Sequence, residues 1–241
     1  MKAIDENIWV VETDFQFLGN NVGNRMTVIK LPSGKLLLHS PTRVSQEIAN
    51  QLKALGQVGF IITPNNFHGL FSYDWLNAFP DATHYSAKRK TNGTFKSLSE
   101  SINDELESAI KVININGIPK LNEYAFIHVP SNTLILTDLA FNFDKQLCSK
   151  LSLWSKLLYR LNDCYQKFGP SKLMRTMIES TEDLGKSINE IKHYPLERII
   201  VSHGNILEKE VLANFSQAFD MNCLKPQKKS SGIRLKPASC G

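Results

Sequence analysis

The pattern of apolar and polar positions predicts paired strands and then a helix in the first sixty residues. β-Branched and other apolar residues dominate segments 7–12, 25–31 and 35–40, and a Pro-Ser-Gly turn between the last two predicts a hairpin. Residues 43–54 instead place apolar side chains four apart, on one face of a helix. A glycine then ends the helical pattern, and residues 58–62 form the short apolar run typical of a buried strand.

The middle of the chain repeats this plan. Segment 73–80 predicts a short helix that ends at a proline, and 83–87 predicts a strand. Residues 97–110 are expected to be helical. Two apolar segments, 123–129 and 133–139, then predict strands on either side of a Pro-Ser-Asn turn. The chain therefore contains two halves in which strands alternate with helices.

The last third is predicted to be mainly helical. A long section, roughly 145–193, carries a helical pattern that a Gly-Pro pair interrupts at 169–170. Apolar residues recur in it at intervals of three and four: Leu151, Trp154, Leu157, Leu158 and Leu161. A strand at 197–202 and a closing helix at about 207–219 complete the chain. Because strands and helices alternate and the strands also form hairpins, the pattern predicts a layered α/β fold rather than a doubly wound sheet.

Length and charge divide the chain into a body and a tail. A chain of 241 residues can bury a sizeable core, and its 42% hydrophobic content is that of a soluble globular protein. We expect one domain over 1–224, with the helical section as an insert. The net charge of +5 belongs to the tail, 225–241, which holds five basic residues and no acidic one. The neutral body predicts no nucleic-acid partner, and the Pro-, Ser- and Gly-containing tail is expected to be disordered or, less simply, to attach weakly to an anionic surface.

The same composition predicts a cytoplasmic protein. The sequence has no apolar run of the length that spans a membrane, and its first residues lack a secretory apolar region. Its four cysteines are widely spaced and are expected to be free thiols: Cys148, Cys164, Cys223 and Cys240. No glycine-rich phosphate loop and no GxSxG motif occurs, so nucleotide binding of those kinds and an α/β-hydrolase nucleophile lack support.

Four predicted strands carry an imidazole or a carboxylate at or just past their C-terminal ends. These residues are His39, His68, Asp138 and His203. Open α/β sheets place ligand sites at such ends, because rigid strands hold the loops that converge there. A carboxylate after the apolar run before Asp138 is costly unless it is paired or bound to a metal. Together the four positions predict a shared site.

Each histidine also has an alternative interpretation as a structural residue. His39 could cap a strand edge, and His203 could belong to an ordinary turn before a helix. His84 and His128 lie within predicted strands and are expected on the sheet surface or in a satisfied core.

With these segments, the chain resembles the metallo-β-lactamase superfamily, over roughly residues 5–220. More closely, it is similar to a poorly characterised branch of that superfamily, a domain of unknown function. The segments that carry the resemblance are KLLLHSP, PNNFHGLF with the later FPDA, TLILTDL and RIIVSHG. The resemblance implies a four-layer αββα sandwich. It also implies that Asp138 is the metal-bridging aspartate, that His203 is the last histidine ligand and that His39 replaces the usual aspartate of the first motif.

The superfamily's second motif is Thr-His-x-His-x-Asp-His, and the chain departs from it. Thr63 matches the threonine, but Pro64 and Asn66 stand where the first two histidines belong. His68 falls on the aspartate, and Gly69 on the final histidine. Neither His84 nor His128 fits the third motif. The segment therefore resembles the metal loop of this fold without the ligands of its first site.

The remaining candidates are His68, Asp138 and His203 as metal ligands, the last two also as catalytic residues. A first zinc site needs about three imidazoles, which this register does not provide. Three N and O donors can hold one zinc, manganese or iron ion, and an amide oxygen from Asn65 or Asn66 could add a ligand. We predict no other cofactor.

Three functions are consistent with this set. The first is a mononuclear metal-dependent hydrolase of a small ester, lactone or thioester. The second is a catalytically inactive, metal-free member of the fold that binds a ligand or protein partner, and the third is a single-iron oxidoreductase. The expected partner is a small molecule, with a homodimer as a further option.

Overall fold

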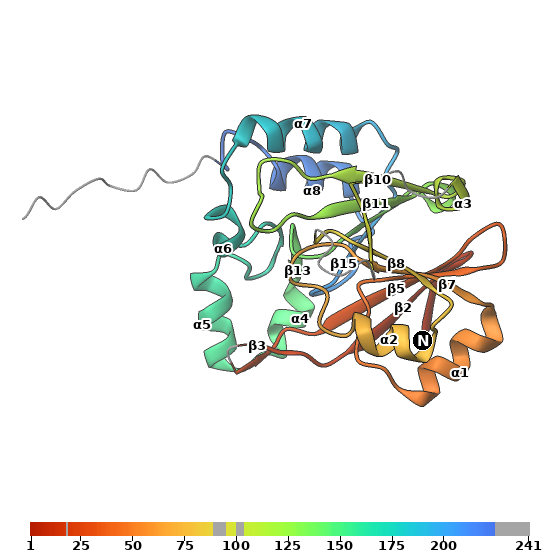
Figure 1. Cartoon of the computed structure of the whole chain (residues 1–241). Helices are drawn as coiled ribbons and strands as arrows, with labels where there is room; N and C mark the ends of the chain where they lie inside the picture. The colour runs from red at the N-terminus through yellow and green to blue at the C-terminus, as the bar shows by residue number, and fades with distance from the viewer. Residues whose placement is uncertain (18, 89–94, 100–103, 225–241) are drawn as a thin grey trace, which may run out of the picture.

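The computed structural model describes residues 1–17, 19–88, 95–99 and 104–224. Two sheets lie face to face, and helices cover the outer face of each, so the molecule has the layer order α-β-β-α (Figure 1). The predicted four-layer αββα sandwich is confirmed. The basic tail expected at 225–241 lies outside the described residues.

The first sheet has seven strands in the order β1-β2-β5-β6-β7-β8-β9. They are β1 Lys2–Asp5, β2 Ile8–Thr13, β5 Asn24–Lys30, β6 Leu36–His39, β7 Val58–Thr63, β8 Thr83–Ser86 and β9 Lys96–Ser97. The predicted hairpin is β5 and β6, which pair antiparallel, whereas β6, β7 and β8 run parallel. Because parallel strands end at one edge, the loops after β6 and β7 emerge side by side.

The second sheet has four strands in the order β10-β11-β12-β15. They are β10 Ile110–Asn114, β11 Tyr124–His128, β12 Thr133–Leu136 and β15 Arg198–Val201. A 3₁₀ turn at Val129–Ser131 joins β11 to β12, and Asn132 ends it in the left-handed conformation that asparagine tolerates. Strands β12 and β15 are parallel, so their C-terminal ends also share one edge.

Alternation along the strands builds the core between the sheets. In β6 and β7, Leu37, Phe60 and Ile62 point toward the second sheet, where Phe126 and Ile135 meet them. Their neighbours in sequence point the opposite way, because successive side chains of a strand alternate between its two faces. Both faces of each sheet are therefore buried, one against the other sheet and one against helices.

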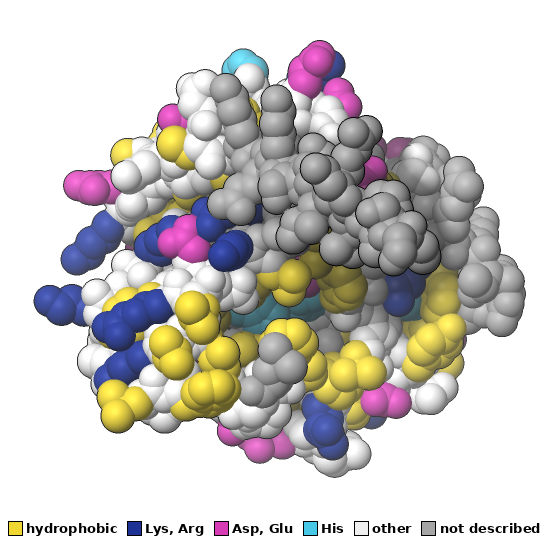
Figure 2. Space-filling view, turned by 90° about the vertical axis from the view of Figure 1, so that its left-hand side faces the viewer, with side chains coloured by type: hydrophobic (Ala, Val, Ile, Leu, Met, Phe, Trp, Pro, Cys, Tyr) yellow, Lys and Arg dark blue, Asp and Glu magenta, His cyan; other side chains and the backbone are white. Residues whose placement is uncertain are grey.

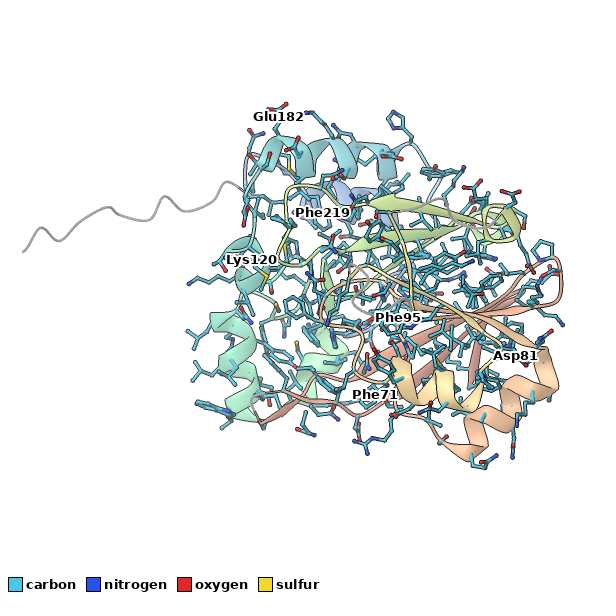
Figure 3. The ribbon with its side chains drawn as sticks, viewed as in Figure 1. Phe71, Asp81, Phe95, Lys120, Glu182 and Phe219 are labelled. Atoms are coloured by element: carbon cyan, nitrogen blue, oxygen red, sulfur yellow. The ribbon has the colours of Figure 1, made fainter. Side chains whose placement is uncertain are left out.

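Helices α1 (Gln46–Leu55) and α2 (Ser72–Ala78) cover the first sheet, and α7 (Thr181–Lys192) and α8 (Val211–Ala218) cover the second (Figure 1). Leu52 of α1 and Trp75 of α2 are fully buried against the first sheet. Phe219, at the end of α8, lies in the layer between the helices and the second sheet (Figure 3). Serine side chains cap α1 and α7, as the sequence chemistry of helix starts predicts.

Short elements gather beside the edge at which the strands end. A two-stranded ribbon forms from β13 (Phe141–Phe143) and β14 (Lys167–Gly169), and a second from β3 (Gln16–Phe17) and β4 (Asn20–Asn21). Three helices follow the first ribbon strand: α4 Lys145–Ser149, α5 Leu153–Leu161 and α6 Lys172–Arg175.

Two sequence predictions need correction. The helix expected over 97–110 is reduced to α3, Asp104–Glu107, because apolar alternation starts β10 at Ile110; residues 100–103 lie outside the described part. The section 145–193 is not one interrupted helix. It is four helices with β14 between α5 and α6, because Lys167–Gly169 pairs with β13.

Three of the four cysteines predicted to be free thiols lie in the described part of the chain, and Cys240 lies outside it. Cys148 and Cys164 are buried free thiols that pack with Phe143 and Tyr159, and Cys223 is a free exposed thiol. No helix in the described ranges is long and apolar enough to cross a membrane.

Candidate metal centre

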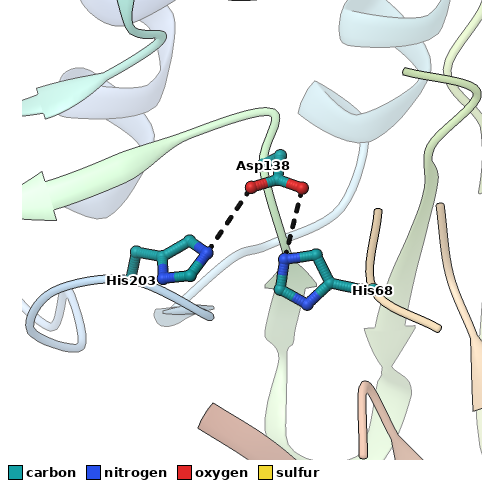
Figure 4. Close-up of side chains that lie close together, drawn as sticks. All are labelled: His68, Asp138 and His203. Atoms are coloured by element: carbon teal, nitrogen blue, oxygen red, sulfur yellow. Dashed lines mark ion pairs between the residues drawn. The ribbon is translucent and has the colours of Figure 1, made fainter. Parts of the chain in front are cut away.

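Three loops bring the three predicted ligands together. His68 lies in the loop after β7, Asp138 lies two residues beyond β12, and His203 lies two residues beyond β15 (Figure 4). One candidate ligand atom from each side chain lies within 4.8 Å of the others. The shared edge of β12 and β15 explains how residues 65 positions apart in sequence become neighbours.

Asp138 lies between the two imidazoles and offers one oxygen to each. Its Oδ2 is 3.2 Å from His68 Nε2, and its Oδ1 is 3.5 Å from His203 Nε2. Zinc binds nitrogen and oxygen ligands at about 2.0–2.1 Å, so two ligands of one tetrahedral ion lie about 3.4 Å apart. The donor set and its spacing therefore fit one small divalent ion.

The second nitrogen of each imidazole is held by the protein. His203 Nδ1 is 2.7 Å from the carbonyl oxygen of Gly23, and His68 Nδ1 is 2.7 Å from the Ser40 hydroxyl. A carbonyl only accepts, so His203 Nδ1 must carry the hydrogen. Neutral His203 then directs the Nε2 lone pair at the Asp138 carboxylate, which is also an acceptor. A proton or a metal ion is needed between them.

A buried carboxylate fixes the loop that carries Asp138. Glu123 is fully buried and accepts hydrogen bonds from three successive backbone amides, those of Thr137, Asp138 and Leu139, at 2.7, 2.9 and 3.0 Å. Asn65 adds a side-chain donor to Glu123 Oε2 at 3.1 Å and another to Asp138 Oδ2 at 2.8 Å. Such outer contacts orient metal ligands and tune their affinity.

The predicted role of the Asn65 amide oxygen is wrong. That oxygen accepts from the backbone amides of Phe67 and His68, both at 2.8 Å, and so shapes the loop rather than facing the site. Asn66 also lies outside the ligand set, because its side chain donates to the Lys120 carbonyl at 3.0 Å.

Close packing and a buried arginine hold the loop that carries His203. Gly204 has φ of +99°, and a Cβ there would lie 2.2 Å from the Asn142 carbonyl oxygen, so only glycine fits. Arg25, in β5, donates to the carbonyl of Val201 and, at 2.7 Å, to that of Gly204. Its charge is balanced by Glu12 at 2.6 Å. This arginine links the first sheet to the loop that the second sheet contributes.

Charge coupling among the buried groups follows from these contacts. Burial opposes the charged imidazole of His68, but the Asp138 carboxylate outweighs it and raises the pKa of His68. Burial likewise opposes the Asp138 anion, yet His68 and His203 hold its pKa well below the usual value. Burial and the nearby Asp138 raise the pKa of Glu123.

The other histidines do not join the ligand set. His39 is buried at the end of β6, packs edge-on against Phe126, and its pKa is lowered to about 3 by burial. Its Nε2 has no hydrogen-bond partner within the described part of the chain. His84 bonds to the Thr63 hydroxyl at 2.8 Å, and His128 to the Ser131 hydroxyl at 2.7 Å, so both act in the fold.

An apolar cavity of about 560 Å³ opens over the three ligands. His68, Asp138 and His203 lie in its wall. Apolar side chains of β13, α5, α6 and the β3–β4 ribbon form part of the remaining wall, and Phe67, Leu70 and Phe71 of the segment between β7 and α2 form another part. Phe141 stacks against the His203 ring with centroids 5.5 Å apart. The short elements beside the strand ends thus form one part of the cavity wall.

Comparison with known structures identifies the fold. A metallo-β-lactamase from Pontibacter korlensis superposes with a TM-score of 0.61 at 12% identity, covering 94% of this chain and 98% of that one. One from Hirschia baltica gives 0.59 at 11% identity, covering 90% and 95%. FIM-1 from Pseudomonas aeruginosa, in its mono-zinc form, gives 0.57 at 11% identity, covering 93% and 96%. The chain has the metallo-β-lactamase fold.

Sequence comparison adds a narrower match. The family model described as a domain of unknown function, DUF4336, matches residues 5–92, in agreement with the predicted branch of the superfamily. A search of curated protein sequences finds no match. Because the structural relatives are distant in sequence, they establish the fold and leave the chemistry to the site itself.

The structure adds positioning residues that sequence reasoning missed. Glu123, Arg25 and Ser40 gave no motif signal, although a glutamate at the start of the apolar strand 123–129 and an arginine at the start of strand 25–31 were visible. Charged residues beside apolar runs are costly to bury unless paired, and this cost could have marked both.

Proposed function

We propose that this chain is a hydrolase of a small ester, lactone or thioester that uses one divalent metal ion held by His68, Asp138 and His203. The observation that carries the proposal is the hydrogen bond from His203 Nδ1 to the Gly23 carbonyl. It leaves the Nε2 lone pair directed at a carboxylate, an arrangement suited to a metal ligand. The mono-zinc form of the structural neighbour FIM-1 supports a single ion in this fold.

A bound zinc, manganese or iron ion would lower the pKa of a water molecule and polarise a carbonyl group. The side chains supply the rest. Glu123 and Asn65 fix Asp138, Gly23 and Ser40 orient the imidazoles, and the apolar cavity wall limits the contact of the site with bulk water. In the overall reaction, water oxygen adds to the carbonyl carbon and the bond from that carbon to the leaving oxygen or sulfur breaks. The water protons are shared between the acid and the released alcohol or thiol.

A metal-free binding module is the second candidate, and two observations favour it. The raised pKa of His68 lets a protonated imidazole bond to Asp138 without any metal. The first-site positions also carry no ligand residues. A two-histidine, one-carboxylate set suits iron(II) too, so a single-iron oxidoreductase shares the same donors.

Metal analysis of the purified protein separates these candidates. We expect about one ion per chain and a rise in melting temperature on adding zinc, manganese or iron(II), because a ligand that binds only the folded state stabilises it. Asp138→Asn and His203→Ala should lose both the ion and the shift, whereas Asp81→Asn, on the surface, should retain them. No ion and no shift in the wild type would reject metal-dependent hydrolysis and support the binding module.

If an ion binds, its identity and the reaction then decide between the first and third candidates. Hydrolysis of a panel of esters, lactones and thioesters that is restored by zinc or manganese supports the hydrolase. Activity that requires iron(II) together with consumption of an oxidant would assign the oxidoreductase instead.

A further inference from the structure

The walls of the cavity carry almost no charge. Among the described residues that line it, Asp138 is the only acid and no lysine or arginine occurs. Apart from the three candidate ligands, the wall is made mainly of phenylalanine, leucine and methionine side chains, with a few neutral polar groups. A charged group of a bound molecule, placed far from His68, Asp138 and His203, would lose its hydration without gaining a partner of opposite charge.

The volume of the cavity and its opening to solvent also indicate an extended ligand. A volume of about 560 Å³ is within the range of pockets that hold small organic ligands. Figure 2 shows histidine side chains in a hollow on this face, with hydrophobic side chains gathered around it. Phe17, Phe67 and Leu70 line the cavity, and their exposed fractions are 50%, 56% and 68%. The apolar wall therefore continues to the rim of the cavity.

We infer that the cavity binds the hydrocarbon chain of an acyl compound, with the carbonyl group at His68, Asp138 and His203. This inference rests on the proposed function for the position of the carbonyl and on the cavity alone for the chain. The substrate class is therefore an ester, thioester or lactone with a long, neutral, apolar acyl group. Compounds with a charged group at the far end of the chain are excluded.

Binding of straight-chain primary alcohols, from butanol to dodecanol, tests the chain site without any reaction. Titration calorimetry of the protein stripped of metal should show affinity rising about fourfold for each added methylene until the cavity is full. The corresponding ω-hydroxy carboxylates should bind at least tenfold more weakly. Affinity that does not depend on chain length would overturn the inference.

A cavity-filling variant locates the binding. Leu158→Trp, on α5, should lower the chain length at which affinity stops rising, because its side chain lines the cavity. Leu212→Trp, on α8 and outside the cavity, is the matched control and should behave as wild type. An unchanged plateau in Leu158→Trp would place the alcohols elsewhere and reject the inference. Chain binding without hydrolysis would reject only the proposed function.

A second feature, the outer face of α5, carries an independent inference. Leu153, Trp154, Leu157 and Leu161 lie on this face and are 85%, 59%, 47% and 62% exposed. Large apolar side chains at this exposure, gathered on one helix, indicate a surface that is covered in use. Leu153, Trp154 and Leu157 do not line the cavity, so a molecule bound in the cavity would not cover them.

The side chains around this face are mostly basic, which indicates an anionic partner. Segment 145–175 holds seven basic residues and one acid, and Lys156 and Arg160 flank the apolar face on α5 itself. Figure 2 shows lysine and arginine side chains near hydrophobic ones on this side of the molecule. Like charges would repel in a pair of copies joined through this face, whereas an anionic lipid surface attracts them. We propose that α5 docks on an anionic membrane surface, with its apolar face in the headgroup region.

Vesicle sedimentation tests the docking. The full chain should bind phosphatidylcholine vesicles that contain phosphatidylserine and should not bind vesicles of phosphatidylcholine alone. Added salt should weaken the binding. Lys156→Glu should reduce binding by more than about fivefold, the effect of removing one basic residue near such a surface. Leu157→Ser should reduce it further, and Leu212→Ser should not. Equal binding by all variants would reject the docking, as would a dimer in solution that Leu157→Ser dissociates.

Discussion

The two loop regions that form the site carry different numbers of candidate metal ligands. The loop after β7 (64–69) places proline, asparagine and glycine at positions where the superfamily motif has histidines, and these residues make contacts within the fold. The Pro64 carbonyl accepts from the Tyr124 amide, and the Asn66 amide donates to the Leu121 carbonyl, at 2.9 and 3.1 Å. The edge after β12 and β15 instead carries Asp138 and His203, which line the cavity.

The contrast shows that contacts within the fold hold the β7 loop in place. The β7 loop is fastened to the second sheet by backbone hydrogen bonds, and these do not depend on a metal ion. It still contributes His68 and Asn65, which both contact Asp138. The β12–β15 edge depends on buried charge, so its geometry should be far more sensitive to single substitutions.

The largest expected effect is therefore on the buried support of that edge. Glu123→Gln replaces a carboxylate that accepts from three backbone amides, and its new amide group cannot accept from all of them. We expect the free energy of unfolding to fall by about 3 kcal/mol, since hydrogen bonds to a buried charge are worth about 1.5–3 kcal/mol each. Chemical denaturation measures it, with the exposed Glu182→Gln as control. A loss below 0.5 kcal/mol, on the order of a surface change, would show that Glu123 does not hold the edge.

At the β7 loop, we expect an effect of acid on the free energy of unfolding rather than an effect on metal binding. His84 is buried against Thr63, and burial lowers its pKa from 6.5 to about 4. Between these values the unfolded chain binds the proton more tightly, so the free energy of unfolding falls as pH falls. The full loss is about 3 kcal/mol once pH reaches 4.

His84→Gln should flatten this pH dependence without abolishing it, because buried His39, with a pKa of about 3, adds a similar one. Denaturant titrations between pH 7 and pH 4 measure the slope, and the exposed His193→Gln is the matched control. The difference in slope between the wild type and His84→Gln should be the same with and without added metal, although metal binding itself depends on pH. If that difference disappears with metal, His84 belongs to the metal site and the contrast between the loops does not hold.

Arg25→Lys tests the connection between the two regions. Lysine keeps the charge but cannot donate to the carbonyls of Val201 and Gly204 together in the geometry of the guanidinium group. Metal affinity should fall about tenfold, within the range for outer contacts of a metal site, while the fold remains. Competition with a chelator gives the affinity, and Arg198→Lys, at the other end of β15, is the control. Unchanged affinity would show that the β15 loop positions His203 without Arg25.

Much of the fold was predictable because burial leaves a periodic signal. Alternation and apolar runs located β2, β5, β6, β7 and β15, and the strand ends located the three candidate ligands. The positioning residues were not predictable in the same way, since Glu123 and Arg25 act through contacts with backbone groups that are 14 to 179 residues away. The prediction of one interrupted helical section at 145–193 was wrong for the same reason. The pairing of β14 with β13 is a long-range contact that local periodicity does not record.

The smallest effect is expected at a position where the superfamily motif has a ligand. Asn66→Ala removes one hydrogen bond, from its side chain to the Lys120 carbonyl at the surface of the β7 loop. Unfolding should become easier by about 1 kcal/mol or less, and metal affinity should stay as in the wild type. Thermal melts with and without zinc measure both quantities, and Asn65→Ala is the informative partner because its amide reaches Asp138 and Glu123. That variant should weaken metal binding at least tenfold. If Asn66→Ala lowered metal affinity as strongly, the loop would still serve as a ligand loop, and the difference between the two regions would not hold.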